Sequence, residues 1–150
     1  MKTIQEYFVQ KMLHTILAEW PEWGLYLQTP RHLLSKSFWF IVPAPNKDIT
    51  RGLSISIDQR MVIVGFDDDH DHLWQWKKEK LPHFRTRVLA RIHDLMNDKI
   101  FAISWRDKEG RLRTSNCFNP EDKRSNQFVQ NGYTKRVRSW SGKQDHDYIE

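Results

Sequence analysis

The sequence predicts an α+β protein in which two main helices pack against an antiparallel sheet. Two segments have apolar residues at helical spacing, and short alternating or continuous apolar segments lie between and after them. The predicted order is α-β-β-β-α-β-β with a possible final strand, which gives a sheet of about five to six strands. The chain has 150 residues, of which 39% are hydrophobic. This size and composition predict a single domain over residues 1–150.

The first helix is predicted to begin at Thr3. Thr3 and Glu6 have the spacing of a capping box, in which each side chain bonds to the backbone N–H of the other residue. Apolar residues then recur with a period near 3.6, and the pattern ends before Pro21. Three aromatic residues at the exit of this helix are expected to fold back over the core: Trp20, Trp23 and Tyr26.

Three strands are predicted to follow this helix. Residues 37–42 form a short aromatic and β-branched segment that ends before two prolines. Residues 51–57 and 61–66 predict a hairpin around 58–60. Leucine and isoleucine alternate with serine in 51–57, so one face of this strand should be buried and the other polar.

The second half of the chain predicts a helix over 82–97, with its proline in the first turn. A hairpin is then expected from 100–105 and 111–115, because Gly110 can adopt the positive φ that the turn requires. A polar loop over 121–126 should precede a last strand within 127–138. Residues 142–150 are expected to form a flexible tail.

Charge and cysteine content narrow the class of protein. The chain has 24 Lys and Arg against 19 Asp and Glu, a net charge of +5, and the excess lies in residues 81–150. Its single cysteine, Cys117, allows no intrachain disulfide and no cysteine-based zinc site. No apolar segment approaches the ~20 residues of a membrane span. We therefore expect a cytoplasmic protein with no cofactor and no membrane partner.

Residues 67–72 combine four carboxylates and two imidazoles: Asp67, Asp68, Asp69, His70, Asp71 and His72. His70 and His72 would lie on one side if the strand continued, which suits a shared divalent metal and predicts, as one alternative, a metal-dependent hydrolase. The other interpretation is a solvated acidic loop at the end of the hairpin, available to a partner.

The C-terminal half interleaves basic and aromatic residues. These are Trp105, Arg106, Arg111, Arg113, Tyr133, Lys135, Arg136, Arg138 and Trp140. Arginine and lysine can neutralise phosphates while exposed rings stack on bases, so a nucleic-acid-binding module using Arg111, Arg113, Lys135, Arg136 and Arg138 is a second alternative. Trp105 and Trp140 also suit a core or an interface.

No catalytic motif appears: the chain has no Gly-rich phosphate loop, no H-E-x-x-H and no G-x-S-x-G. The hairpin over 52–66, followed by the acidic stretch and the His70-x-His72 pair, resembles small bacterial immunity proteins from polymorphic toxin loci. Some of these belong to contact-dependent growth inhibition systems. The resemblance covers the hairpin region only.

The resemblance implies a non-enzymatic cytoplasmic protein that neutralises a cognate toxin, such as a nuclease, by occluding its active site. In this interpretation the acidic residues Asp67, Asp68, Asp69 and Asp71 stand in for phosphates in a basic cleft. Trp74 and Trp76 would be the flanking aromatic anchors. Alternatively, the basic C-terminal half would contact an acidic toxin.

Overall fold

The computed structural model describes residues 3–28, 37–49, 51–118 and 132–149. Within these ranges the chain forms two long α-helices, one short 3₁₀ helix and nine strands in two antiparallel sheets. The α+β class is therefore confirmed. The strands divide into sheets of five and four instead of forming one sheet of five or six.

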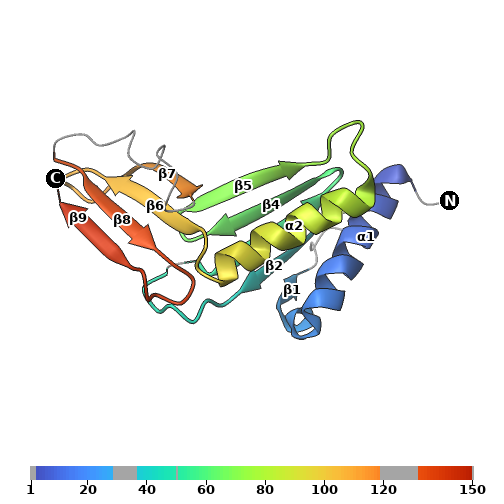
Figure 1. Cartoon of the computed structure of the whole chain (residues 1–150), viewed down its shortest axis with the longest axis horizontal. Helices are drawn as coiled ribbons and strands as arrows, with labels where there is room; N and C mark the ends of the chain where they lie inside the picture. The colour runs from blue at the N-terminus through green and yellow to red at the C-terminus, as the bar shows by residue number, and fades with distance from the viewer. Residues whose placement is uncertain (1–2, 29–36, 50, 119–131, 150) are drawn as a thin grey trace.

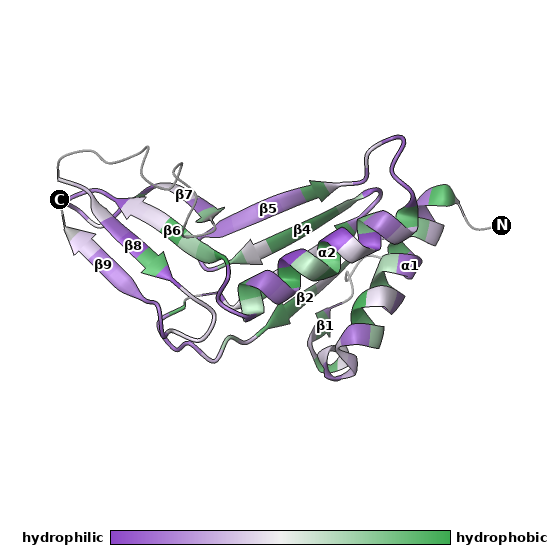
Figure 2. Ribbon diagram, viewed as in Figure 1, coloured by the Kyte–Doolittle hydropathy of each residue, from purple (hydrophilic) through white to green (hydrophobic). Residues whose placement is uncertain are grey.

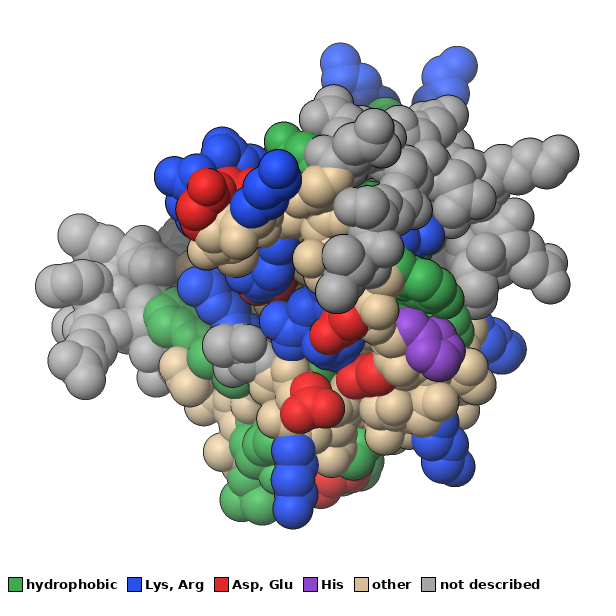
Figure 3. All heavy atoms as spheres, turned by 90° about the vertical axis from the view of Figure 1, so that its left-hand side faces the viewer, with side chains coloured by type: hydrophobic (Ala, Val, Ile, Leu, Met, Phe, Trp, Pro, Cys, Tyr) green, Lys and Arg blue, Asp and Glu red, His purple; other side chains and the backbone are tan. Residues whose placement is uncertain are grey.

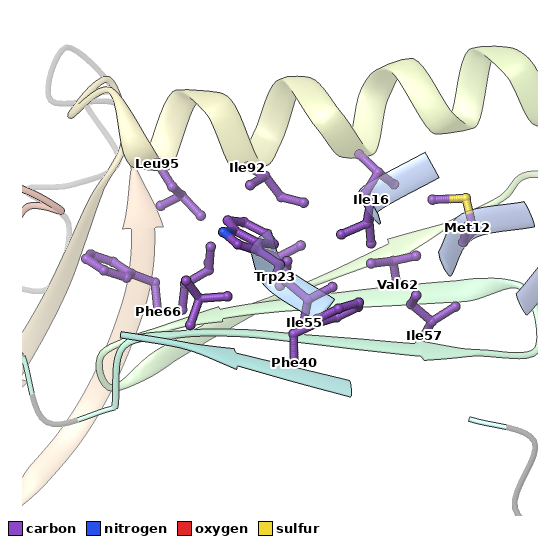
Figure 4. Packing of buried hydrophobic residues seen from close by; sticks show 14 of the residues in the cluster. Met12, Ile16, Trp23, Phe40, Ile55, Ile57, Val62, Phe66, Ile92 and Leu95 are labelled. Atoms are coloured by element: carbon purple, nitrogen blue, oxygen red, sulfur yellow. The ribbon is translucent and has the colours of Figure 1, made fainter. Parts of the chain in front are cut away.

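The first sheet has the strand order β1-β2-β3-β4-β5. Its strands are β1 (Leu27–Gln28), β2 (Phe38–Val42), β3 (Leu53–Asp58), β4 (Met61–Phe66) and β5 (Asp69–Trp74). The long helices α1 (Ile4–Glu19) and α2 (Leu81–Met96) cover one face of this sheet (Figures 1 and 4). The 3₁₀ helix η1 (Pro21–Tyr26) follows α1 and buries Trp23.

The second sheet has the order β7-β6-β8-β9 and lies at the end of the molecule opposite the start of α1 (Figure 1). Its strands are β6 (Phe101–Arg106), β7 (Leu112–Phe118), β8 (Thr134–Arg138) and β9 (His146–Ile149). Strand β5 of the first sheet lies against β7 and β6 of the second. The two sheets therefore meet along β5 and the turn that precedes it.

The predicted helices are confirmed, and their boundaries follow from local chemistry. The Thr3 N–H donates to Glu6 Oε2 over 2.6 Å, and the Glu6 N–H donates to Thr3 Oγ1 over 3.2 Å. This completes the predicted capping box. The second helix spans Leu81–Met96, one residue earlier at each end than predicted, with Pro82 in its first turn.

The main core lies between the helices and the first sheet (Figure 4). Strand β3 pairs with β4 so that Ile55 lies opposite Val64, and both side chains are buried. Trp23 packs near Phe40, with ring centroids 6.5 Å apart. The predicted hairpin is confirmed, and its turn is tighter than predicted because Gln59 adopts a positive φ of 44°.

Two strands lie where the sequence predicted loops. Residues 69–74 form β5, although Figure 2 shows this strand mostly hydrophilic beside the hydrophobic β4. Residues 146–149 form β9 and pair with β8, so the expectation of a flexible tail over 142–150 is wrong for this part. The predicted last strand is confirmed at Thr134–Arg138. The predicted polar loop over 121–126 lies outside the described residues.

Candidate functional site

The four aspartates of residues 67–71 all have partners elsewhere in the chain. Asp67 lies in the β4–β5 turn and is only 6% exposed. The pairs are Asp67 with Arg136 at 3.9 Å, Asp68 with Arg106, Asp69 with Ser115 at 3.1 Å, and Asp71 with Arg91. These carboxylates do not form the solvated acidic loop that the sequence suggested.

The partners of these aspartates come from four different elements. Arg106, Ser115 and Arg136 belong to β6, β7 and β8 of the second sheet, and Arg91 belongs to α2. A partly buried carboxylate is stabilised by such a partner and is costly without one. The acidic cluster therefore links the two sheets. Three of its four carboxylates face an arginine, and the fourth, Asp69, faces the hydroxyl group of Ser115. The cluster's role as a phosphate mimic stays a prediction.

The basic residues of the β6–β7 hairpin are also matched by acidic ones. Arg111 Nε and Arg113 Nε each lie 2.9 Å from Asp107 Oδ2. Desolvation raises the pKa of Asp107, but hydrogen bonds from the backbone and side chain of Arg111, with the nearby charge of Arg113, lower it to about 2. These arginines are held within their own turn.

The remaining cations of the nucleic-acid alternative have partners as well. Arg138 Nη1 lies 2.6 Å from Asp147 Oδ1, and Lys135 Nζ lies 5.7 Å from the centre of the Tyr148 ring. Figure 3 shows this end of the molecule, where basic and acidic side chains of the described residues are intermingled. Trp105 and Trp140 are 2% and 9% exposed and cannot stack on bases in this arrangement. The second sheet therefore presents no continuous basic surface among the described residues.

For the metal alternative, the described part of the chain brings together two possible ligands and no third. His70 and His72 lie on the same face of β5, with ring centroids 4.9 Å apart, and both are exposed. Within the described ranges no group of three or more His, Cys, Asp or Glu side chains is placed to hold a metal ion. The aspartates between and before the imidazoles point to the opposite face, where Asp69 and Asp71 meet their partners.

Cys117 does not lie in a reactive environment. Its thiol is buried, and burial raises the pKa of Cys117 well above its ordinary value. The carboxylates of Asp69 and Asp71 raise this pKa further. Cys117 is therefore a structural residue near the junction of the two sheets.

The strongest candidate site is the face of the first sheet that α1 and α2 do not cover; we call it the outer face. Strand pairing aligns its residues in two complete rows across β2, β3, β4 and β5. One row is Ile41, Ser54, Gly65 and His70, and the other is Trp39, Ser56, Ile63 and His72. Met61 and Trp74 pair beyond the second row. Four strands thus present one continuous surface.

The outer face carries large apolar side chains and few charges. Ile41 is 47% exposed and Trp74 is 50% exposed, and Asp58 is the one Asp, Glu, Lys or Arg among the β2–β5 positions on this face, which also hold two serines and two histidines. A solvated sheet face normally carries more charged residues than this. Aromatic and aliphatic residues without charges are typical of the centre of a protein–protein interface.

A hollow of about 530 Å³ opens at one end of the outer face. Ile41, Ser54, Ile63 and Gly65 line it on the side of the sheet. The charged end of the hollow is lined by Arg51, His70 and the aspartates Asp67, Asp68 and Asp69. A Cβ atom at Gly65 would lie 2.3 Å from Ser54 Oγ and would fill this space. The glycine therefore keeps the sheet surface open where the two strands approach.

Sequence reasoning placed Trp74 in a binding surface but missed Trp39, Ile41 and Ile63. Strand β2 contains the continuous apolar run Phe-Trp-Phe-Ile-Val. Only alternate residues of this run, Phe40 and Val42, are buried. When a strand is apolar on both faces and helices cover only one face of its sheet, the apolar side chains of the other face stay exposed. The continuous apolar run of β2 was the sequence feature that could have predicted this exposed surface.

No protein-family model matches the chain, and neither a curated protein nor a solved structure is similar to it. The helices of the described residues are all too short or too polar to cross a membrane. The case for function therefore rests on the surfaces of this molecule.

Proposed function

We propose that the chain is a non-enzymatic binding protein that holds a protein partner against the outer face of its first sheet. The resemblance of the hairpin supports a specific form of this proposal, an immunity protein that neutralises a cognate bacterial toxin in the cytoplasm. The observation that carries the proposal is the combination of exposed large apolar side chains and few charges on the outer face. In the immunity form, the partner's active site would be occluded by this face.

The two tryptophans on the outer face have the properties of binding anchors. Trp39 Nε1 donates to Gln28 Oε1 over 2.8 Å, which fixes the orientation of the indole ring. The carbonyl of Trp74 accepts a hydrogen bond of 2.6 Å from Arg87 Nη2, which fixes the end of β5. A ring that is held before binding, as that of Trp39 is, loses less conformational entropy when a partner docks.

The two alternative functions have less support. A nucleic-acid interface on the second sheet would need Arg111, Arg113 and Arg138 to give up their carboxylate partners. A metal-dependent hydrolase would need further ligands beside His70 and His72 from outside the described residues. A protein interface on the outer face requires no such rearrangement.

The test compares two matched double variants as baits. Ile41→Lys with Trp74→Lys places two charges on the outer face, at side chains that are 47% and 50% exposed. Leu112→Lys with Tyr148→Lys makes the same changes on the second sheet, at 43% and 49% exposure. Tagged wild-type protein is first used to isolate partners from nuclease-treated lysate of the producing cells, and affinities of the purified partner are then measured.

We expect the outer-face variant to bind its protein partner at least about tenfold more weakly, because anchor residues of an interface often contribute ~2 kcal/mol or more each. The second-sheet variant should bind like wild type, and urea unfolding must show that both variants are folded. Equal affinities of the two variants would contradict the proposal. A parallel isolation from untreated lysate that retains nucleic acid, with no protein partner retained from either lysate, would also contradict it.

A further inference from the structure

The loop between β5 and α2, residues 75–80, is a rigid projection. It extends beyond the neighbouring strand ends at the end of the molecule where α1 and α2 begin (Figure 1). The Gln75 N–H donates to Arg60 O over 3.0 Å, and Gln75 Nε2 donates to Glu79 O over 2.9 Å. Arg87 joins the loop to α2 through Glu79, at 2.9 and 3.1 Å. The loop therefore presents a fixed surface to the solvent.

The outward side chains of this loop are cationic. Lys77, Lys78 and Lys80 are exposed, and no carboxylate in the described part of the chain forms an ion pair with them. Glu79 does not offset these charges fully, because it is paired with Arg87. The hydrogen bond from Arg87 lowers the pKa of Glu79, so this pair stays ionised at neutral pH. Three ammonium groups thus remain available at the tip.

Apolar side chains are exposed beside these lysines. Trp76, in the same loop, is 69% exposed. The N-terminal halves of the two helices pack together near this end, where the rings of Phe8 and Phe84 lie 5.6 Å apart. In the first turn of α1, Ile4 is 84% exposed and Tyr7 is 53% exposed. This end of the molecule therefore combines aromatic, aliphatic and cationic groups.

We propose that this end, defined by Ile4, Tyr7, Trp76, Lys77, Lys78 and Lys80, docks on an anionic lipid surface. Tryptophan and tyrosine favour the interface between lipid headgroups and acyl chains. Lysines near the surface are attracted by the negative potential of anionic lipids. The exposed isoleucine and the projecting shape fit a lipid interface better than a nucleic acid, which is bound in basic grooves with stacked bases.

This inference changes the expectation of no membrane partner, which depended on the lack of an apolar span. A surface-docked protein needs no such span, because apolar insertion and charge attraction act together. The proposed lipid-docking end adjoins the outer face at Trp74 but shares no residue with it. The two proposals are tested with different variants and can therefore fail independently.

The test measures co-sedimentation of the full chain with vesicles of phosphatidylcholine alone and of phosphatidylcholine with about 30% phosphatidylglycerol, at low and at physiological salt. Two variants change the docking end: Trp76→Ala, and Lys77→Glu with Lys78→Glu. The control, Lys108→Glu with Lys143→Glu, makes the same change in net charge at two exposed lysines near the second sheet.

We expect binding to the anionic vesicles only, weakened by salt. Each docking-end variant should lower the partition coefficient by about tenfold or more, while the control variant stays within about twofold of wild type. An equal loss of vesicle binding in the control variant would show that the effect comes from net charge alone, and would overturn the proposal. Absence of binding to anionic vesicles at low salt would also overturn it, as would tighter binding of a single-stranded oligonucleotide that displaces the vesicles.

Discussion

The ion pair between Asp68 and Arg106 links the β4–β5 turn of the first sheet to β6 of the second, and its removal should destabilise the fold. The side chains of Asp68 and Arg106 are 18% and 27% exposed. Arg106 also donates to Gly110 O over 3.1 Å, so the guanidinium is held on both sides. This pair therefore tests whether the acidic cluster holds the two sheets together.

The expected magnitude follows from this partial burial. Breaking a fully buried pair costs ~3–5 kcal/mol, whereas an exposed pair contributes at most ~1 kcal/mol. We expect Asp68→Asn and Arg106→Met each to lower the free energy of unfolding by about 2 kcal/mol. The double variant should lose about 1.5 kcal/mol less than the sum of the single losses, because the second change no longer leaves a partly buried charge alone.

The assay is urea unfolding of the wild type, both single variants and the double variant at pH 7. With a slope near 2 kcal/mol per molar urea, each single variant should shift the midpoint by about 1 M. Glu109→Gln, at a side chain that is 64% exposed, is the control and should stay within about 0.5 kcal/mol of wild type. Additive losses, to within about 0.5 kcal/mol, would refute the coupling and with it the role of this pair at the junction.

Two further predictions concern the turns. The Asp107 carboxyl should titrate with a pKa of about 2 by NMR. Its stabilising effect on the fold is then complete above the pKa of the unfolded chain, near 4, and is lost as the pH falls toward 2. A titration midpoint near 4 would show that Arg111 does not bind this carboxylate. Gly52→Ala should cost more than about 2 kcal/mol in urea unfolding, because its φ is +30° and a Cβ would lie 2.4 Å from Val42 O, whereas the control Gly24→Ala should be nearly neutral. Similar losses at the two glycines would contradict this reading of the close contact.

Local patterns predicted the elements whose residues determine their own structure. The capping box at Thr3 and Glu6 gave the start of α1, and the alternation in 51–57 gave the buried face of β3. Strand β5 was not predicted, because aspartate has a low β-propensity and two of its inward positions are Asp69 and Asp71. These positions tolerate carboxylates because β7 and α2 supply their partners.

The division into two sheets could not be predicted from the order of the elements. It depends on contacts between residues far apart in the sequence, such as Asp68 with Arg106 and Asp71 with Arg91. The distribution of charged residues along the sequence suggested one acidic and one basic surface. In the fold, many of these acidic and basic side chains form ion pairs or hydrogen bonds with each other. The candidate binding face was therefore identified from the residues that the core and the junction leave exposed.

The pairing at the junction also decides how a role of the acidic cluster in binding can be tested. Changing Asp67 to lysine would place a positive charge beside Arg136, and changing Asp69 to lysine would remove one of the two acceptors of the Ser115 hydroxyl group. Either change would weaken the junction before any partner is present. A loss of partner affinity in such a variant would then report unfolding as readily as a lost contact. Lysine at Ile41 or Trp74 breaks no hydrogen bond or ion pair of the described side chains, so a loss of affinity there, in a variant of unchanged stability, assigns the contact to the outer face.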